Sequence, residues 1–298
     1  MSWTTLCVPA SSANLGPGFD ALGLALSIYL ECRFRASETL SIRVAGCDAA
    51  LIPADASNLI WQTALDVARS AGRTLGPVEL EIVNNIPLGK GLGSSAAALV
   101  AGICIADQAL NLEWSRGRIL DCAAQLEGHP DNAAASVLGG FTVSSLDESG
   151  RVTAVRLEIP ENLGIALIVP SFPLPTAESR AVLPETYSRR DVIFNVQRTS
   201  LLVAALAAGD LTALAASLED RLHQPYRAAL VPGLQAALDF RMDGLIGCVL
   251  SGAGPAVLAF YQPGAEHVCE AVRDIVTGGC DRAQMLYAAV SLCGFTLE

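Results

Sequence analysis

The spacing of hydrophobic positions in the first third of the chain changes between the period of a strand and the period of a helix. Short stretches that alternate or are continuously apolar predict strands, and apolar residues three and four positions apart predict a helix. Four strands are expected, at residues 4–9, 25–35, 40–45 and 78–84, and one helix at residues 59–71.

The middle of the chain has two helical patterns in succession, about 94–110 and 116–127, with no strand between them. A short helix near 132–138 and a strand at 141–145 follow, before a polar turn at Leu146–Arg151. We place a domain boundary near 155–162, which divides the chain into residues 1–158 and 159–298.

The second half predicts a strand, several helices, two strands, a helix and a last strand. This is the order of a ferredoxin-like domain with additional helices inserted, so the chain as a whole is expected to be α+β. The strands are expected at 164–169, 245–250, 256–261 and 285–292, and the helices at 176–183, 191–208, 210–222, 233–240 and 265–277.

The composition favours a compact cytoplasmic protein. Of the 298 residues, 52% are hydrophobic and 16% are charged, which is enough apolar material for a sizeable core. The longest apolar run, Ala96–Ala106, is about half of the ~20 residues that a membrane span requires, and no secretory signal pattern opens the chain. The nine cysteines are odd in number and none are spaced Cys-x-x-Cys, so neither a disulfide framework nor a zinc site is expected.

The net charge of −11 argues against a nucleic-acid partner, because such binding depends on neutralisation of phosphates by Lys and Arg. A small anionic ligand would need a local positive site within this negative field.

The glycine-rich segment 87–97 (PLGKGLGSSAA) supplies such a site. Glycines expose main-chain N–H groups, Ser94 and Ser95 can cap the following helix, and the helix N-terminus adds partial positive charge. A P-loop is excluded because Gly91, not Ser or Thr, follows Lys90. The pattern Gly-x-Gly-x-x-Ala with Glu113 downstream fits a dinucleotide site, but that site needs a parallel strand where a second helix is predicted. A simple turn with a good helix cap is the remaining alternative.

Three stretches together resemble the superfamily of galactokinases, homoserine kinases, mevalonate kinases and phosphomevalonate kinases. Segment 87–97 is similar to its ATP-binding signature, Ser251–Phe260 (SGAGPAVLAF) resembles its C-terminal glycine motif, and Pro9–Leu26 (PASSANLGPGFDALGLAL) resembles the N-terminal motif of homoserine kinases in particular. The resemblance implies a two-domain fold, with a ribosomal-protein-S5-domain-2-like first domain and a ferredoxin-like second domain. It also implies ATP-dependent phosphorylation of the side-chain hydroxyl of L-homoserine in threonine biosynthesis.

The cofactors implied by the resemblance are ATP and Mg²⁺. Glu127 lies four residues after Ala123 on the inward side of its predicted helix, where a carboxylate is costly unless a cation or hydrogen bonds meet it. An exposed position at a frayed helix end is the alternative. By resemblance, Glu127 and Ser95 ligate Mg²⁺, and Asn58 contacts adenine, although a helix N-cap explains Asn58 equally well. The ATP-binding loop comprises Pro87, Leu88, Gly89, Lys90, Gly91, Leu92, Gly93, Ser94, Ser95, Ala96 and Ala97.

The segment EGHPDN places an imidazole, a carboxylate and an amide on one turn. It resembles the active-site segment of homoserine kinases, which implies that His129 lies near the substrate and Asn132 near the transferred phosphoryl group. Asp131 and Asn132 are the candidate catalytic residues. Asp131 can also be a helix cap, and whether it acts as a general base stays open. We expect catalysis by positioning and charge stabilisation.

An amino-acid substrate needs a cation for its carboxylate and acceptors for its ammonium group. By resemblance, Arg180 and Arg227 bind the carboxylate, while Asn14 and Asp20 contact the amino-acid substrate, Asp20 at its ammonium or hydroxyl group. Turn formation is the alternative explanation for Asn14 and Asp20, because Asn and Asp favour turns.

Two other functions remain open. One is another small-molecule kinase of the superfamily, of the mevalonate or diphosphocytidyl-methylerythritol type, against which the Pro9–Leu26 motif and the two arginines argue. The other is a catalytically silent ligand sensor, which would be expected to lose Glu127 or the loop serines. The expected partner is L-homoserine, without nucleic acid or membrane, and a homodimer is one assembly that the sequence leaves open.

Overall fold

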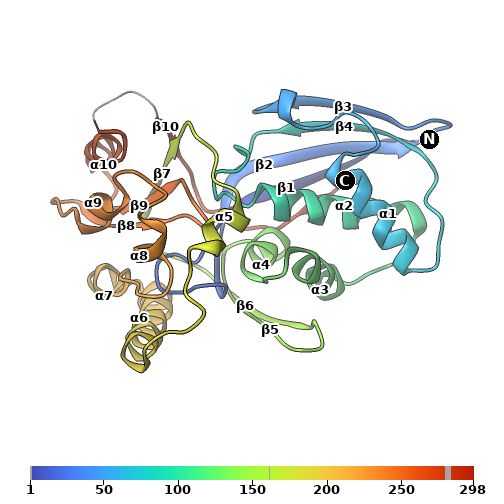
Figure 1. The fold of residues 1–298 in the computed structure, drawn as a ribbon. Helices are drawn as coiled ribbons and strands as arrows, with labels where there is room; N and C mark the ends of the chain where they lie inside the picture. The colour runs from blue at the N-terminus through green and yellow to red at the C-terminus, as the bar shows by residue number, and fades with distance from the viewer. Residues whose placement is uncertain (1, 161, 279–282) are drawn as a thin grey trace.

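The computed structural model describes residues 2–160, 162–278 and 283–298, and two β-sheets organise them (Figure 1). Residue 161, which falls within the expected domain boundary, lies outside the described residues. The first sheet has seven strands in the order β11-β1-β2-β4-β3, with β5 and β6 joined to it through β2. All its pairings are antiparallel except that of β3 with β4. Its strands are β1 (Thr4–Ala13), β2 (Leu22–Ala36), β3 (Ser41–Gly46), β4 (Val78–Asn84), β5 (Phe141–Leu146), β6 (Val152–Leu157) and β11 (Thr296–Leu297).

Helices pack beneath the first sheet, and the most central of them is α2, which contacts α1, α3, α4 and the sheet (Figure 1). Its close approach to α1 depends on Gly102, because a Cβ there would overlap the Ile60 carbonyl oxygen and the Thr63 side chain. Since α3 and not a strand follows α2, the rejection of a dinucleotide site is confirmed. The helices of this half are α1 (Leu59–Ser70), α2 (Ser94–Leu110), α3 (Arg116–Glu127) and α4 (Asp131–Leu138), with a 3₁₀ turn, η1, at Ala49–Leu51.

The second sheet is antiparallel in the order β10-β7-β9-β8, which is the order that the ferredoxin-like prediction requires. Its strands are β7 (Gly164–Pro170), β8 (Leu245–Leu250), β9 (Val257–Tyr261) and β10 (Ala283–Tyr287). The predicted α+β class is therefore confirmed. The helices of this half are α5 (Thr176–Ala181), α6 (Arg189–Ala208), α7 (Leu211–Ser217), α8 (Gln224–Arg227), α9 (Leu234–Asp239) and α10 (His267–Thr277).

Three differences from the sequence prediction have physical causes. The half-exposed strand β6 completes a hairpin with β5 where only a turn and a boundary were expected, since its sequence VTAVRL carries little apolar periodicity. The helix expected at 210–222 ends at Ser217, because the Asp220 carboxylate accepts the backbone N–H groups of residues 222–224 and so forms a turn.

The last strand expected at 285–292 was also wrong in extent. The chain leaves the second sheet after Tyr287, forms a bridge between Val290 and Leu26, and ends as β11 beside β1. Apolar residues are continuous from Met285 to Val290, so the pattern could not show where the chain passes from the second sheet to the first. The proposed division at 158 and 159 stays a prediction.

Helix α6 has the length and composition of a membrane-spanning helix, the only one with both among the described residues, and 22% of its apolar window is buried. Its polar side chains nevertheless bond within the fold: Asn195 donates to Asp220 and to the Pro17 carbonyl oxygen, and Asp191 pairs with Arg221. These contacts are typical of a helix packed on a protein domain. The expected absence of a membrane partner stays a prediction.

Candidate active site

A cavity of about 180 Å³ lies between the glycine loop before α2, the turn before α4, and residues of the second half. It gathers residues from six separate stretches of sequence. The lining residues are Ala13, Asn14, Asp20, Gly89, Gly91, Leu92, Gly93, Ser94, Ser95, Glu127, His129, Asp131, Asn132, Leu174, Pro175, Thr176, Arg180, Arg227, Gly252 and Ala253.

The glycine loop has a conformation that side chains would not tolerate. Gly91 has a φ of 75°, and a Cβ on it would overlap the backbone oxygen of Ser251. Gly93 has a φ of 69° and would place a Cβ on the Ser11 hydroxyl. The loop therefore lies directly against β1 and the turn before β9, and glycine is what allows this approach.

The start of α2 differs from the expected serine cap. Gly93 is the N-cap, in the left-handed conformation, and no side chain caps the helix. Within residues 2–160, 162–278 and 283–298, the N–H groups of Ser94, Ser95 and Ala96 donate to no protein acceptor. Three free donors at a helix N-terminus suit an anionic group such as phosphate.

Glu127 and Ser95, the two predicted metal ligands, are in contact. The Ser95 hydroxyl donates to Glu127 Oε2 over 3.1 Å, and Glu127 is the last residue of α3. Burial raises the pKa of Glu127, against the nearby positive charge of His129 and the Ser95 hydrogen bond. A carboxylate and a hydroxyl oxygen beside the N-terminus of α2 are the ligand types that Mg²⁺ prefers, so the residues present fit this ion.

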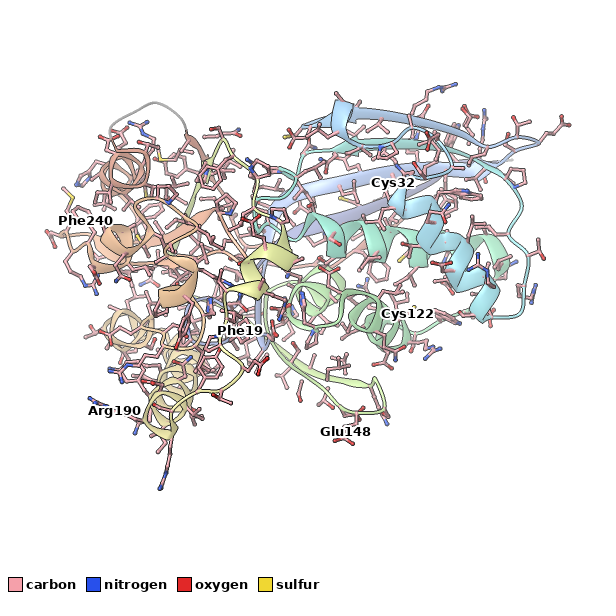
Figure 2. All side chains as sticks on the ribbon, viewed as in Figure 1. Phe19, Cys32, Cys122, Glu148, Arg190 and Phe240 are labelled. Carbon is pink, nitrogen blue, oxygen red and sulfur yellow. The ribbon has the colours of Figure 1, made fainter. Side chains whose placement is uncertain are left out.

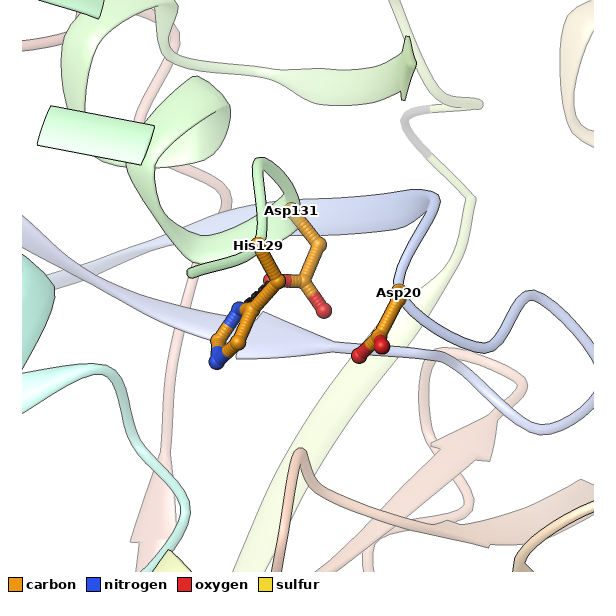
Figure 3. Close-up of side chains that lie close together, drawn as sticks. All are labelled: Asp20, His129 and Asp131. Atoms are coloured by element: carbon orange, nitrogen blue, oxygen red, sulfur yellow. Dashed lines mark hydrogen bonds and ion pairs between the residues drawn. The ribbon is translucent and has the colours of Figure 1, made fainter. Parts of the chain in front are cut away.

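The turn before α4 joins His129 to Asp131, whose Oδ1 lies 2.6 Å from His129 Nδ1 (Figure 3). The same oxygen accepts the backbone N–H of Asn132 over 2.7 Å, so Asp131 caps its own helix start from the first helical position. Burial lowers the pKa of His129, but the hydrogen bond and charge of Asp131 outweigh it and leave the pKa above its ordinary value of 6.5. Asn132 is buried and accepts the Ser11 hydroxyl over 2.8 Å.

Asp20 faces this turn from the loop between β1 and β2 (Figure 3), and Arg180 on α5 binds it with two hydrogen bonds of 3.0 and 2.7 Å. Asn14 supports the loop, because its side chain accepts the Asp20 N–H and donates to the Gly252 carbonyl oxygen. Both residues have positive φ, 69° for Asn14 and 55° for Asp20, so the turn interpretation is correct as well. Asp20, expected to bind the substrate ammonium group, and Arg180, expected to bind its carboxylate, are thus hydrogen-bonded to each other.

Arg227, 1% exposed, is the second predicted carboxylate ligand. Its Nε donates to the Ser179 carbonyl oxygen and its Nη1 to the Gly252 carbonyl oxygen, each over 3.1 Å. Burial, together with the like charge of Arg180, lowers the pKa of Arg227 to about 10, so the side chain stays cationic at neutral pH. The cavity therefore holds two guanidinium groups within a protein of net charge −11.

Several predicted loop residues do not face this cavity. Lys90 turns its ammonium group away and donates to the carbonyl oxygens of Pro170 and Ser171 at the end of β7, over 2.8 and 2.7 Å. Pro87 lies on that same side, beside Lys90. The side chains of Ala96 and Ala97 are fully buried in the core.

Asn58 is the N-cap of α1, with its side chain accepting the N–H of Ile60 over 3.0 Å, and it also lines a second cavity. This cavity, of about 300 Å³, adjoins the first because Gly89, Ser94 and Ser95 line both. Its walls are largely apolar, as a purine base would require. The apolar lining includes Leu30, Leu51, Ile52, Pro53, Leu59, Ile82 and Leu88.

Sequence reasoning missed two groups of residues in these cavities. Leu51, Ile52 and Pro53 lie in a loop that carries no periodic signal. Gly252 and Ala253 belong to the Ser251–Phe260 motif, which was identified as a motif without being assigned to the site.

Both halves of the chain match one class of small-molecule kinases. Residues 58–140 match the N-terminal domain of the GHMP kinases, and residues 202–276 match their C-terminal domain. A homoserine kinase of Solibacter usitatus is 58% identical over 296 residues, which cover 99% of this chain and 97% of that protein. One of Deinococcus radiodurans is 45% identical over 87% of this chain and 84% of that protein.

The crystal structure of a homoserine kinase from Cytophaga hutchinsonii has a TM-score of 0.86 to this chain at 27% identity, and the match covers 100% of this chain and 98% of that one. The chain therefore belongs to the GHMP kinases and, among them, to the homoserine kinase family.

Proposed function

We propose that the protein transfers the γ-phosphoryl group of ATP to the side-chain hydroxyl of L-homoserine, giving O-phospho-L-homoserine and ADP, as a step of threonine biosynthesis. The observation that carries the proposal is the pairing of Asp20 with Arg180, beside Arg227, in one cavity with the phosphate-binding helix end. A free amino acid is a zwitterion, and its two charges match this set: the carboxylate suits the arginines and the ammonium suits Asp20.

The same charges argue against a substrate such as mevalonate. A carboxylate without an ammonium group would draw Arg180 from Asp20 and offer Asp20 no partner in exchange. Leaving the half-buried Asp20 carboxylate without a partner costs free energy, reduced by its partial exposure to water. The Asp20–Arg180 pair thus favours a zwitterion over a simple anion.

The nucleotide is proposed to lie across both cavities, with its base in the apolar cavity that Asn58 lines and its phosphates at the N–H groups of Ser94, Ser95 and Ala96. Glu127 and Ser95 would hold Mg²⁺, which when bound neutralises charge on the phosphate oxygens. Asn132 and His129 line the same cavity as this helix end and Asp20, where they can orient the acceptor hydroxyl and stabilise charge on the transferred group.

Asp131 is better suited to positioning than to proton abstraction. Its Oδ1 already accepts two hydrogen bonds, from the His129 ring and from the Asn132 backbone, and these fix the geometry of the turn. We therefore propose catalysis by positioning and electrostatic stabilisation, as is general for phosphoryl transfer.

An assay of ADP release with homoserine, mevalonate and shikimate tests the substrate. Of these three compounds, only homoserine is expected to be phosphorylated. Absence of turnover with homoserine would overturn the proposal. Calorimetry with magnesium nucleotide tests the alternative of a silent sensor, which would bind ATP without transferring phosphate; the contact between Ser95 and Glu127 argues against it. A cytoplasmic location, a homodimer and the absence of nucleic-acid and membrane partners remain predictions.

A further inference from the structure

His223 is in direct contact with Arg227, and its side chain is completely buried. The proposed reaction does not use it as a substrate ligand, since it does not line the cavity between the glycine loop and α5. Its ring nevertheless bonds at both nitrogens: Nδ1 lies 3.1 Å from Arg227 Nη1, and Nε2 lies 2.6 Å from the Gly16 carbonyl oxygen.

These two contacts determine the protonation of the ring. A guanidinium group only donates hydrogen bonds, so His223 Nδ1 must carry a lone pair where it meets Arg227. A carbonyl oxygen only accepts, so Nε2 must carry the proton that it donates to Gly16. His223 is therefore the neutral Nε2–H tautomer. Burial lowers its pKa, and the charge of Arg227 acts in the same direction, against Asp220 and the Gly16 hydrogen bond.

The backbone of His223 is held as firmly as its ring. The Asp220 carboxylate accepts the N–H groups of Leu222, His223 and Gln224 at the start of α8. Asn195 on α6 donates to the same carboxylate over 2.7 Å. These hydrogen bonds therefore fix the backbone position from which the His223 ring contacts Arg227.

His223 connects the two sides of the substrate cavity. Gly16, which accepts its Nε2–H, lies in the loop that carries Asn14 and Asp20, and Phe19 of this loop stacks on the His223 ring with centroids 5.2 Å apart. Phe19 lies at the junction of the two halves of the molecule (Figure 2). On its other side the ring meets Arg227. The His223 ring thus contacts both Arg227, which is proposed to bind the substrate carboxylate, and the loop of Asp20, which is proposed to bind its ammonium group.

The contacts of Arg227 show what this connection achieves. Its Nε and Nη1 are engaged by Ser179, Gly252 and His223, whereas Nη2 has no protein acceptor within residues 2–160, 162–278 and 283–298. Nη2 is the nitrogen left to bind an anion in the cavity that Arg227 lines.

We propose that His223 is a positioning residue, which holds Arg227 Nη2 in the cavity and sets its spacing from the Asp20 loop, and so determines the affinity for an α-amino-acid substrate. This role rests on the proposed function, since it assumes that homoserine presents a carboxylate to Arg227.

The tautomer can be measured in the wild-type protein, with one variant to assign the signal. The chain has only three histidines, so ¹⁵N NMR of the imidazole groups at pH 7.5 resolves few signals. One ring is expected to be neutral with a protonated Nε2 and an unprotonated Nδ1, and this signal should disappear in His223→Asn. A His223 ring that is doubly protonated, or protonated at Nδ1, would contradict the proposal.

Kinetics of two variants test the role itself. His223→Phe keeps an aromatic ring beside Phe19 and removes both nitrogens, so the KM for homoserine should rise ~10- to 100-fold, the range for a charged donor that loses its partner. The kcat and the KM for ATP should stay within about threefold, as expected when binding alone is weakened. His223→Asn returns an acceptor near the position of Nδ1 and should recover most of the lost affinity. His267→Asn, at an exposed position, is the matched control.

The outcomes separate the two proposals. Absence of homoserine turnover by the wild-type protein overturns the proposed function and this role with it. Normal turnover by the wild type, with an unchanged homoserine KM in His223→Phe, overturns the positioning role alone. A defect in His223→Phe that is equal for homoserine and ATP, or that His223→Asn does not relieve, indicates a structural role only and also overturns it.

Discussion

Single residues in the cavity form polar contacts between distant parts of the sequence. Asp20 and Arg180 are 160 positions apart, and Ser95 and Glu127 are 32 apart, yet each pair is in direct contact. Their geometry depends on backbone features, such as the positive φ of Asp20 and the final position of Glu127 in α3.

Replacement of Glu127 by Ala should lower kcat by ~10²-fold or more, the scale of losing one preorganised group that stabilises transition-state charge. The measurement is steady-state kinetics at saturating Mg²⁺, with circular dichroism to show that the fold is retained. Glu148→Ala, in the exposed turn between β5 and β6, is the control and should have normal activity. An unchanged kcat for Glu127→Ala would exclude it as a metal ligand.

The residue types of the site were predictable from the sequence, but their connections were not. The turn EGHPDN and the inward position of Glu127 follow from local patterns, and the structure brings these residues together with Asn14, Asp20, Arg180 and Arg227. Lys90 could not be assigned in the same way. A lysine in a phosphate-binding loop suggests a phosphate contact, yet the carbonyl oxygens of Pro170 and Ser171 at the end of β7 bind its ammonium group instead.

At the scale of elements, the glycine loop and α2 form one unit whose shape depends on close backbone contact. Gly91 approaches the turn that follows β8, and the N–H of Ala256 donates to the Lys90 carbonyl oxygen across the same contact. The glycine loop is thereby attached to both sheets.

Gly91→Ala should weaken magnesium-nucleotide binding ~10-fold or more, since its Cβ would meet a backbone oxygen that cannot move without shifting the loop. Gly72→Ala is the matched control, because Gly72 also has a positive φ, 67°, but nothing within 4 Å of an added Cβ. That control should cost about 1–2 kcal/mol of stability from backbone strain alone and leave nucleotide affinity unchanged. Calorimetry and denaturant unfolding measure the two effects. Equal nucleotide affinity in both variants would show that the loop tolerates the displacement.

Most elements were predictable because their periodicity is local. The expected helix at 116–127 and strand at 78–84 agree with α3 and β4 to the residue. The elements that sequence analysis missed or misplaced, β6, α8 and β11, are short or half-exposed, and they are defined by pairing or by the Asp220 turn. Such partners are distant in sequence, so no window of hydrophobicity reveals them.

Across the whole molecule, the segment after Tyr287 returns to the first sheet and joins the beginning of the chain to its last residues. Thr5 and Glu298 exchange two backbone hydrogen bonds, and Phe295 packs beneath Arg116, whose guanidinium lies 4.3 Å from the ring centroid. The two ends of the chain accordingly lie on the same side of the molecule (Figure 1).

Phe295→Ala should destabilise the protein by about 3–5 kcal/mol, because Phe295 is only 4% exposed. Leu292→Ala removes an apolar side chain three residues earlier that is 61% exposed, and it should change the stability by less than about 0.5 kcal/mol. Chemical unfolding monitored by circular dichroism compares the two. Equal effects would mean that the Phe295 side chain contributes nothing to the first sheet.

The stability of the whole molecule should also depend on His223. The folded pKa of His223 is lowered, by burial first and by Arg227 in addition, whereas Asp220 and Asp20 act to raise it. Below about pH 6.5 the unfolded chain therefore binds a proton that the folded protein does not, and stability falls as the pH decreases. His129 acts in the opposite sense because its folded pKa is raised.

Comparison of wild type with His223→Phe isolates this contribution. The loss of stability in the variant should be smaller at pH 5 than at pH 7.5, by at most about 2 kcal/mol. Urea unfolding at both pH values is the measurement, and His267→Asn is again the control. A loss that is equal at the two pH values would mean that folding does not lower the pKa of His223.

The return of residues 294–298 to β1 has a consequence for protein synthesis. On the ribosome, β1 to β6 emerge before any of the second sheet, yet the outer edge of β1 stays uncovered until β11 has been translated. An uncovered strand edge is a template for pairing with other chains, so the nascent protein carries this hazard until β11 has been synthesised. Residues 294–298 therefore cover a strand that is synthesised long before them, and the first sheet can close only after β11 has been made.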